Sequence, residues 1–570
     1  MVTKSKRSRR TNDPVTPRPV PPVTADPALA VVIGTRLTLR GLAACAAACA
    51  TDVARGRVHA VERAVARGVR SSRRATAVEN AVATVLDDAA AGADRWACAE
   101  AATWALARLV RRRPAAGSAG RHLERLVAEA RSAVDILAER DTRPARFLLV
   151  LARLFGDVDA CRDLERPATA AVAEEISRLV TVDGAVGLSG SAAVVERVCR
   201  WAGLRAAGGA LGGVAWDEPV ERRWAAASAG ALRLLGAGGR GLAVSGRLPI
   251  AVTAPLLEEV ARSAKGRARR TARALRSSDA KVSRRGLVPL DQHDAAAAVA
   301  VVRTGWGRDA VRVMLEYRDA APRLEIAVGD RLLVDGGWDW TTSVDGRPLD
   351  VEGAWAVECW EADRKAACVE IVAPLAGGLR IERQVVVLRR ERIVLLADAI
   401  VPGGTAAAGT DGDLGHRMAV RLAPALDAEP AAETREVLVY DGRMRAMALP
   451  LALPEWRITG QGSLDVTDGE LALTQTGRRR LYAPLWLDCD PRRSGRQLTW
   501  RQLTVADTRR NLPPQQAAGF RVQSGDEQWL LYRALDMPRN RTLLGCNVSC
   551  GFLLGRIKRS GEVARTIEIE

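Results

Sequence analysis

The residue types that carry most proton-transfer chemistry are scarce in this chain. Its 570 residues include four tyrosines and four histidines, the latter being His59, His122, His293 and His416. Imidazole and phenol groups are common general bases, so few positions can fill that role. The chain also lacks a G-x-x-x-x-G-K-[ST] loop, an H-E-x-x-H helix and a G-x-S-x-G turn. These absences exclude a P-loop nucleotide site, a zincin site and a nucleophile elbow.

Metal-binding cysteine spacing is also missing. The chain has ten cysteines but no C-x-x-C pair, and structural zinc needs four suitably spaced ligands. We therefore expect small buried thiols, a reducing compartment and no cofactor. One cation site stays open as an alternative, formed by Asp291, His293 and Asp294 of the DQHD segment.

Long uncharged apolar runs are absent, which excludes a membrane-spanning helix. The N-terminus is basic and then proline-rich, without the apolar stretch of a signal peptide. Residues 1–27 are predicted to be a disordered basic tail. The sequence as given predicts a cytoplasmic protein, or a periplasmic or envelope protein if the start is mis-assigned.

Positive charge is abundant, with a formal net charge of +18 at pH 7. Only six of the 85 basic residues are lysine, a bias typical of a GC-rich genome, and the basic residues are dispersed. Dispersed surface charge is the expected explanation, and a polyanion site is the alternative. Nucleic acid is not expected as a partner, and the sequence does not indicate the oligomeric state.

Helical periodicity extends over residues 28–285. Apolar residues recur every three or four positions, which places them on one helix face. The clearest stripes lie at 99–110, 121–140, 172–180, 194–204 and 224–235. Short gly-rich breaks between helices of modest length predict an array of α-helical hairpins, an incomplete α/α toroid.

The period changes to two over residues 286–570. Leu324, Ile326 and Val328 alternate with other residues, as on a strand with two distinct faces. Two-residue hairpin loops are predicted at 329–330, 345–346, 441–442, 468–469 and 560–561, where Gly supplies the positive φ. The expected structure is a large antiparallel β-sandwich.

Three segments of the second half resemble the heparinase II/III-like polysaccharide lyases. They are AVAVVRTGWGRDAVRVMLEYRD followed by RLEIAVGDRLLVDGGWDW (298–340, with a Leu-Val-Asp-Gly turn at 333–336), LRIERQVVVLRRERIVLLADAIV (379–401) and QWLLYRALDMPRNRTLLGCNVSCGFLLGRI (528–557). The resemblance implies an α/α toroid followed by a β-sandwich, a bacterial origin and a carbohydrate ligand. The helical half resembles the family only in its pattern.

Catalysis by β-elimination from a uronate needs a base and a group that neutralises the substrate carboxylate. The resemblance implies a histidine just before the Val-Asp-Gly turn, and this chain has none there. Tyr317 and His293 are the remaining candidate catalytic residues, and Arg318 is a candidate for the carboxylate. Adjacent strand residues point to opposite faces, so Tyr317 and Arg318 are not expected to converge. We expect an incomplete catalytic set.

Trp338 and Trp340 lie two residues apart and share one face of a predicted strand. They would stack on sugar rings if exposed, and would fill the sandwich if buried. Fourteen tryptophans against four phenylalanines favour the packing role, with substrate binding as the alternative.

The predicted function is binding of an acidic polysaccharide in the groove between the helical and β parts, with a degenerate catalytic site. An active uronate lyase is one alternative. A structural or interaction protein without a ligand is another.

Overall fold

The structure is a computed structural model that describes residues 35–49, 51–68, 71–89, 94–112, 118–243, 246–247, 250–276, 286–404, 412–457, 462–493, 495–508 and 510–570. The predicted tail, residues 1–27, lies outside the described residues. The chain divides into two compact units, one of Met1–Val172 with Ala207–Val214 and one of Ala173–Ala206 with Ala215–Glu570. The predicted boundary at 285/286 falls inside the second unit and stays a prediction.

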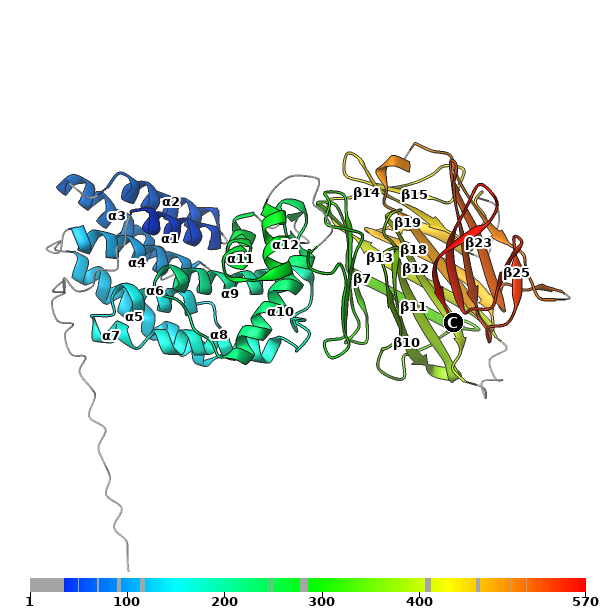
Figure 1. The fold of residues 1–570 in the computed structure, drawn as a ribbon, viewed down its shortest axis with the longest axis horizontal. Helices are drawn as coiled ribbons and strands as arrows, with labels where there is room; N and C mark the ends of the chain where they lie inside the picture. The colour runs from blue at the N-terminus through cyan, green and yellow to red at the C-terminus, as the bar shows by residue number, and fades with distance from the viewer. Residues whose placement is uncertain are drawn as a thin grey trace, which may run out of the picture. The chain divides into compact units, whose positions relative to one another are not determined.

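Helices occupy the described chain before residue 277, as the helical periodicity predicted (Figure 1). They are α1 (Thr35–Ala48), α2 (Asp52–Ala66), α3 (Ser72–Ala89), α4 (Arg95–Arg112), α5 (Ala119–Ala138), α6 (Ala145–Leu154), α7 (Asp159–Arg162), α8 (Glu165–Leu179), α9 (Ser191–Ala210), α10 (Glu218–Leu234), η1 (Ala237–Gly239), α11 (Ile250–Ser263) and α12 (Gly266–Arg276). The strands β1 (Leu242–Ala243) and β2 (Gly246–Arg247) form a small ladder between α10 and α11. No helix of the described residues is long and apolar enough to cross a membrane.

Helix α4 is the centre of the first unit. Its residues from Ala97 to Leu109 are all buried, and it packs against α1, α3, α5 and α6. Many of these residues are alanine, which allows neighbouring helices to approach closely. The closest approach is at Gly41 of α1, where a Cβ atom would lie 2.4 Å from Cε2 of Trp104. Glycine at position 41 therefore makes room for the buried indole ring.

Antiparallel strands form the described chain after residue 291. One sheet has the order β14 (Asp427–Pro430), β15 (Val437–Tyr440), β16 (Met444–Pro450), β19 (Leu481–Asp488), β12 (Ile393–Pro402), β11 (Leu379–Leu388), β10 (Ala366–Leu375), β9 (Ala356–Ala362). A second has the order β17 (Gly462–Thr467), β18 (Glu470–Arg478), β13 (Asp413–Leu422), β7 (Arg331–Val344), β6 (Arg323–Val328), β5 (Val311–Glu316), β4 (Val299–Arg303), β3 (Gln292–Asp294), with β8 (Arg347–Pro348) paired to β7.

Two smaller sheets complete the β part. A five-stranded sheet has the order β20 (Leu498–Leu503), β23 (Ala517–Ser524), β24 (Glu527–Ala534), β27 (Phe552–Ile557), β28 (Val563–Ile569). A four-stranded sheet has the order β22 (Asn511–Leu512), β21 (Val505–Ala506), β25 (Arg541–Leu543), β26 (Cys546–Val548). Short 3-10 turns, η2 (Ala376–Gly378) and η3 (Pro491–Arg493), connect strands.

The sheets are stacked in layers with hydrophobic cores between them (Figure 1). The nine-stranded sheet packs on one face of the eight-stranded sheet, for example through Val313 and Val369. The five-stranded sheet packs on the opposite face, where Cys368 and Phe520 belong to one core. Successive residues of β10 thus enter different cores, because a strand projects its side chains alternately. The predicted α-then-β fold class is confirmed, with more sheet layers than one sandwich requires.

All five predicted hairpin loops join neighbouring antiparallel strands. Those at 329–330, 345–346 and 468–469 are two-residue loops between strand ends. The other two were predicted too short, because residues 441–443 separate β15 from β16 and residues 558–562 separate β27 from β28. Gly442 and Gly561 still adopt positive φ there, so the glycine signal marked the turn but not its length.

Candidate functional site

A pocket of about 340 Å³ lies where the chain segment after α10 meets several turns of the β part. All of its lining residues belong to the second compact unit. They are Gly236, Ala237, Gly238, Arg240, Leu242, Arg308, Asp309, Arg312, Gly329, Asp330, Arg443 and Arg445. Five arginines and two aspartates give this arginine pocket an excess of positive charge.

Backbone contacts hold the turns that line the arginine pocket. The β6–β7 turn is tied to the β4–β5 loop (304–310) by the Gly329 amide, which donates to the Ala310 carbonyl at 3.0 Å. Gly329 has φ 62°, and a Cβ there would lie 3.1 Å from the Arg308 carbonyl oxygen. Glycine therefore satisfies both the turn geometry and the close approach of the loop that carries Arg308.

Arg312 of β5 is the buried arginine of the pocket, with 5% of its surface exposed. Its guanidinium donates to the carbonyls of Leu234, at 3.0 Å, and Gly329, at 3.1 Å. These bonds join the end of α10 to the β6–β7 turn. Burial lowers the pKa of Arg312 to about 10, and Asp330 and Glu325 partly offset this effect. The group therefore remains a cation at neutral pH.

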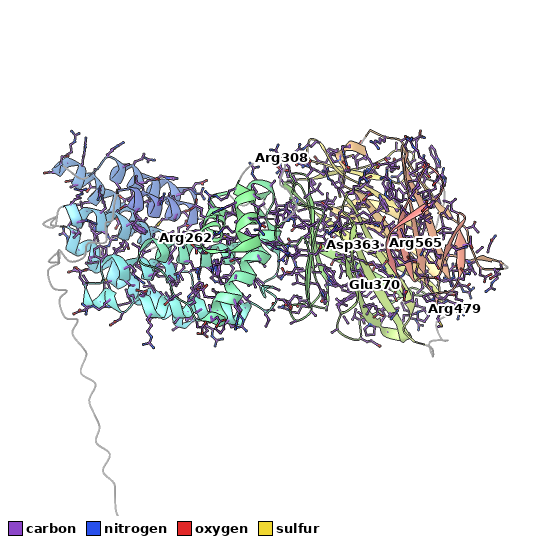
Figure 2. The ribbon with its side chains drawn as sticks, in the orientation of Figure 1. Arg262, Arg308, Asp363, Glu370, Arg479 and Arg565 are labelled. Atoms are coloured by element: carbon purple, nitrogen blue, oxygen red, sulfur yellow. The ribbon has the colours of Figure 1, made fainter. Side chains whose placement is uncertain are left out.

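The remaining arginines of the pocket differ in their pairing. Arg445 binds Asp441 with Nε–Oδ1 and Nη2–Oδ2 distances of 2.6 and 2.8 Å, and lies 3.4 Å from Asp330. Arg443 is 71% exposed and lies 3.9 Å from Asp330. Within the described part of the chain, no carboxylate pairs with Arg240 or Arg308. Figure 2 labels Arg308 at this edge of the β part. Such a set of cations can bind carboxylate or sulfate groups by charge-assisted hydrogen bonds.

The sequence-predicted residues His293 and Tyr317 lie together. His293 Nε2 and Tyr317 Oη are 2.9 Å apart, within hydrogen-bonding distance. Trp360 of β9 stacks on the imidazole, with ring centroids 5.0 Å apart. Since β3 and β9 are end strands of the nine- and eight-stranded sheets, this aromatic group closes one open edge between them.

The electrostatics of this pair favour neutral groups. Burial lowers the pKa of His293, with Asp294 acting in the opposite direction. Burial also raises the pKa of Tyr317, and Asp294 adds to that shift. Imidazole and phenol are therefore both uncharged at neutral pH. A phenol with a raised pKa is a poor general base.

The pair and the arginine pocket lie on opposite faces of one sheet. Val311, Val313 and Tyr317 belong to the hydrophobic core between the two large sheets. Arg312 alternates with them and lines the pocket beside the helical segment. The two candidate catalytic residues therefore do not face the arginines.

The predicted cation ligands diverge. Asp291 accepts two bonds from Arg389, at 3.0 and 2.8 Å, and burial raises the pKa of Asp291 against the effect of that arginine. Asp294 accepts from the Thr181 hydroxyl and the Ala297 amide. In the part of the chain that the structure describes, no three His, Cys, Asp or Glu side chains form a metal cluster. The residues present therefore do not fit the cation site left open by the sequence.

Arg318 and the tryptophan pair also have internal partners. Arg318 donates to the Ala297 carbonyl at 2.9 Å. Trp338 is fully buried, with the Arg383 guanidinium carbon 3.8 Å from its ring centroid. Trp340 is half-buried and contacts Trp355 edge to face at 6.4 Å. The packing role that the sequence favoured for the pair agrees with these positions.

Sequence reasoning missed the arginine pocket. Its charged residues extend from Arg240 to Arg445 along the chain, and no local motif connects them. One signal was present in VRVMLE (311–316), where Arg312 interrupts a strand whose other residues up to Leu315 are apolar and buried. A charge on a buried strand needs a partner or a function.

Comparison with solved structures gives the fold. The chain matches the "Heparinase III-BT4657 gene product" with a TM-score of 0.52 and 10% sequence identity, covering 88% of this chain and 84% of that chain. It matches heparan sulfate lyase HepC from Pedobacter heparinus with a TM-score of 0.47 and 13% identity, covering 87% and 81%. No protein-family model and no curated protein matches the sequence. The resemblance drawn from the sequence is thus confirmed as a likeness of fold.

Proposed function

We propose that this chain, whose fold is that of the heparinase II/III-like polysaccharide lyases, binds an acidic polysaccharide in the arginine pocket without cleaving it. The observation that supports binding is the excess of arginines around that pocket, with Arg312 buried among carbonyl partners. Carboxylate and sulfate groups of a glycan are the chemical class that such guanidinium groups recognise.

The position of the candidate catalytic pair supports the non-catalytic part of the proposal. His293 and Tyr317 bond to each other and face the core between the two large sheets, away from the arginine pocket. A base must reach the proton that it removes. A glycan held by Arg312 would have the sheet itself between its ring and the Tyr317 hydroxyl.

Binding is tested with heparan sulfate, heparin and alginate by isothermal titration calorimetry over a range of salt concentrations. The variant Arg240→Gln/Arg308→Gln/Arg443→Gln should bind about tenfold more weakly, because losses of about 0.5 kcal/mol per charge contact sum to about 1.5 kcal/mol, and a tenfold change corresponds to about 1.4 kcal/mol. Lysine at the same three positions keeps the charge and should retain most of the affinity.

The matched control removes three exposed arginines elsewhere, Arg143, Arg162 and Arg222, whose side chains are 59%, 60% and 70% exposed. This variant has the same net charge and should bind like the wild type. Equal losses in both variants would indicate nonspecific attraction and contradict the proposed site. No binding to any of the three glycans at low salt would favour a structural or interaction protein instead.

Cleavage is tested by following the ultraviolet absorbance of unsaturated products from the same glycans. We expect no turnover. Turnover that Tyr317→Phe abolishes would overturn the non-catalytic part and favour the active uronate lyase.

A further inference from the structure

A second and larger pocket, of about 670 Å³, lies on the other side of the β4–β5 loop. Its walls are that loop, the β9–β10 and β11–β12 turns, and the C-terminal strands β27 and β28. Eight of its lining residues are arginine or lysine, and Glu391 is the one carboxylate among them. We name it the second basic pocket.

Among the described residues, the β9–β10 and β11–β12 turns carry cations that have no carboxylate partner. In the chain as described, Arg364, Lys365 and Arg390 have no ion-pair partner. All three are exposed and line the pocket. Three unpaired cations close together repel one another, and an anion in the pocket would relieve that repulsion.

A buried arginine holds these two turns in place. Arg389 Nε donates to the Asp363 carbonyl at 2.8 Å, and the Arg389 amide donates to the Lys365 carbonyl at 2.9 Å. The same guanidinium binds both carboxylate oxygens of Asp291. The turns that carry the unpaired cations are therefore fixed before any ligand arrives, which lowers the entropy cost of binding.

The opposite wall is built from the end of the chain. Arg565 of β28 pairs with Glu568 and donates to the Asn547 carbonyl at 3.0 Å, and Arg556 of β27 lies 2.9 Å from Glu527. Figure 2 labels Arg565 on this wall and Asp363 at the β9–β10 turn. These arginines are partly neutralised, so the turns supply most of the excess charge.

The second basic pocket shares a wall with the arginine pocket. Arg308 and Asp309 of the β4–β5 loop line the arginine pocket, and Thr304 and Gly307 of the same loop line the second one. Asp309 also pairs with Arg392 of the second pocket at 3.8 Å. Because Asp309 is 60% exposed, this ion pair contributes little energy and is only a weak barrier between the two pockets.

We propose that the second basic pocket is a further anion-binding site, and that one acidic polysaccharide chain occupies both pockets by crossing the β4–β5 loop. The choice of ligand rests on the proposed function. The protein therefore selects long chains, because a chain that engages two sites binds more tightly than a fragment that fills one.

The test compares a heparin tetrasaccharide with unfractionated heparin by calorimetry. The variants are Arg364→Gln/Lys365→Gln/Arg390→Gln for the second pocket, Arg240→Gln/Arg308→Gln/Arg443→Gln for the first, and Arg143→Gln/Arg162→Gln/Arg222→Gln as the control. Wild type and control should bind two tetrasaccharides per chain, and each pocket variant one. Unfractionated heparin should bind wild type at least about tenfold more tightly than either pocket variant, because each variant weakens one of the two linked sites.

Two results separate this inference from the proposed function. If the second-pocket variant keeps the wild-type stoichiometry and heparin affinity, the inference is overturned and the arginine pocket is unaffected. If the second-pocket variant loses a tetrasaccharide site and the arginine-pocket variant does not, the second basic pocket is supported as an anion site. The same result overturns the proposed function of the arginine pocket, and with it the proposal that one polysaccharide occupies both pockets. Circular dichroism of each variant checks that the fold is intact.

Discussion

The imidazole of His293 and the hydroxyl of Tyr317 are hydrogen-bonded at 2.9 Å, on end strand β3 and just after β5 of the same sheet. His293 stacks on Trp360 of the facing sheet, and Tyr317 belongs to the core between the two large sheets. Neither residue faces the arginine pocket. This pairing explains how residues suited to catalysis can instead close the edge of a layered β structure.

Removing the Tyr317 hydroxyl should affect stability and leave glycan binding unchanged. Tyr317→Phe removes the hydrogen bond to a half-buried imidazole nitrogen, which costs about 0.5–1.5 kcal/mol. Urea unfolding measures this loss, and heparin titration provides the control. A tenfold loss of heparin affinity without a change in stability would place Tyr317 in the binding site instead.

Stability should depend on pH through His293. The folded state lowers the pKa of His293 below its value of about 6.5 in the unfolded chain, so the unfolded state takes up the proton first. The stability that the neutral imidazole provides is complete above about pH 6.5 and is lost as the pH falls from there toward the folded pKa. Burial of His122 acts in the same direction.

The variant His293→Gln should flatten this pH dependence in urea unfolding at several pH values. Tyr317→Phe keeps the half-buried imidazole and should keep the change of unfolding free energy with pH. If the unfolding free energy changed equally with pH in wild type and His293→Gln, the pH dependence could not be assigned to His293.

The buried charges beside Trp338 should be essential for stability. Arg383 binds Asp398 with an Nε–Oδ1 distance of 2.9 Å, and His416 lies 3.1 Å from the same carboxylate. Burial tends to raise the pKa of Asp398, but Arg383 and His416 outweigh it and the pKa is lowered. Asp398→Asn should cost about 3–5 kcal/mol, because it leaves a buried guanidinium uncompensated.

A matched control for this change is Asp526→Asn, in an ion pair whose members are 88% and 91% exposed. Its cost should be below about 1 kcal/mol. Similar losses in the two variants, measured by urea unfolding, would show that burial of the Arg383 pair does not matter.

Replacing either of two helical glycines by alanine should change the stability of the protein, in opposite directions. A Cβ at position 41 would lie 2.4 Å from the Trp104 ring, so Gly41→Ala should destabilise by about 1–3 kcal/mol. A Cβ at Gly56 of α2 meets nothing within 4 Å, so Gly56→Ala should stabilise by about 0.5–1 kcal/mol. Thermal unfolding followed by circular dichroism compares them. A stabilising Gly41→Ala would mean that α1 and α4 can move apart without loss.

The sequence predicted what depends on local pattern. Period-two alternation and the Asp-Gly and Gly-Asp turns identified the β part, because strand pleat and positive φ are local requirements. The segment 379–401, one of the three that resemble the lyase family, forms the paired strands β11 and β12. The alternation could not show that both faces of these strands are buried, since that depends on sheets formed later in the chain.

The candidate sites depended on contacts that no local pattern contains. The partner of His293 lies 24 residues away, and Arg312 meets the end of α10 at a separation of 78 residues. Net charge could not single out the arginines of the pocket, because arginine is dispersed along the whole chain. Only the folded arrangement distinguishes paired arginines from those that gather around a pocket.

The central strands β11, β12 and β19 of the eight-stranded sheet are buried on both faces, since one hydrophobic core covers each side. Trp486 of β19 contacts Trp529 of the five-stranded sheet, with ring centroids 5.7 Å apart. The C-terminal strands therefore cover one face of the eight-stranded sheet and cannot be removed without exposing it. A chain shortened before Leu498 would expose a broad apolar surface on the middle layer and would be expected to aggregate.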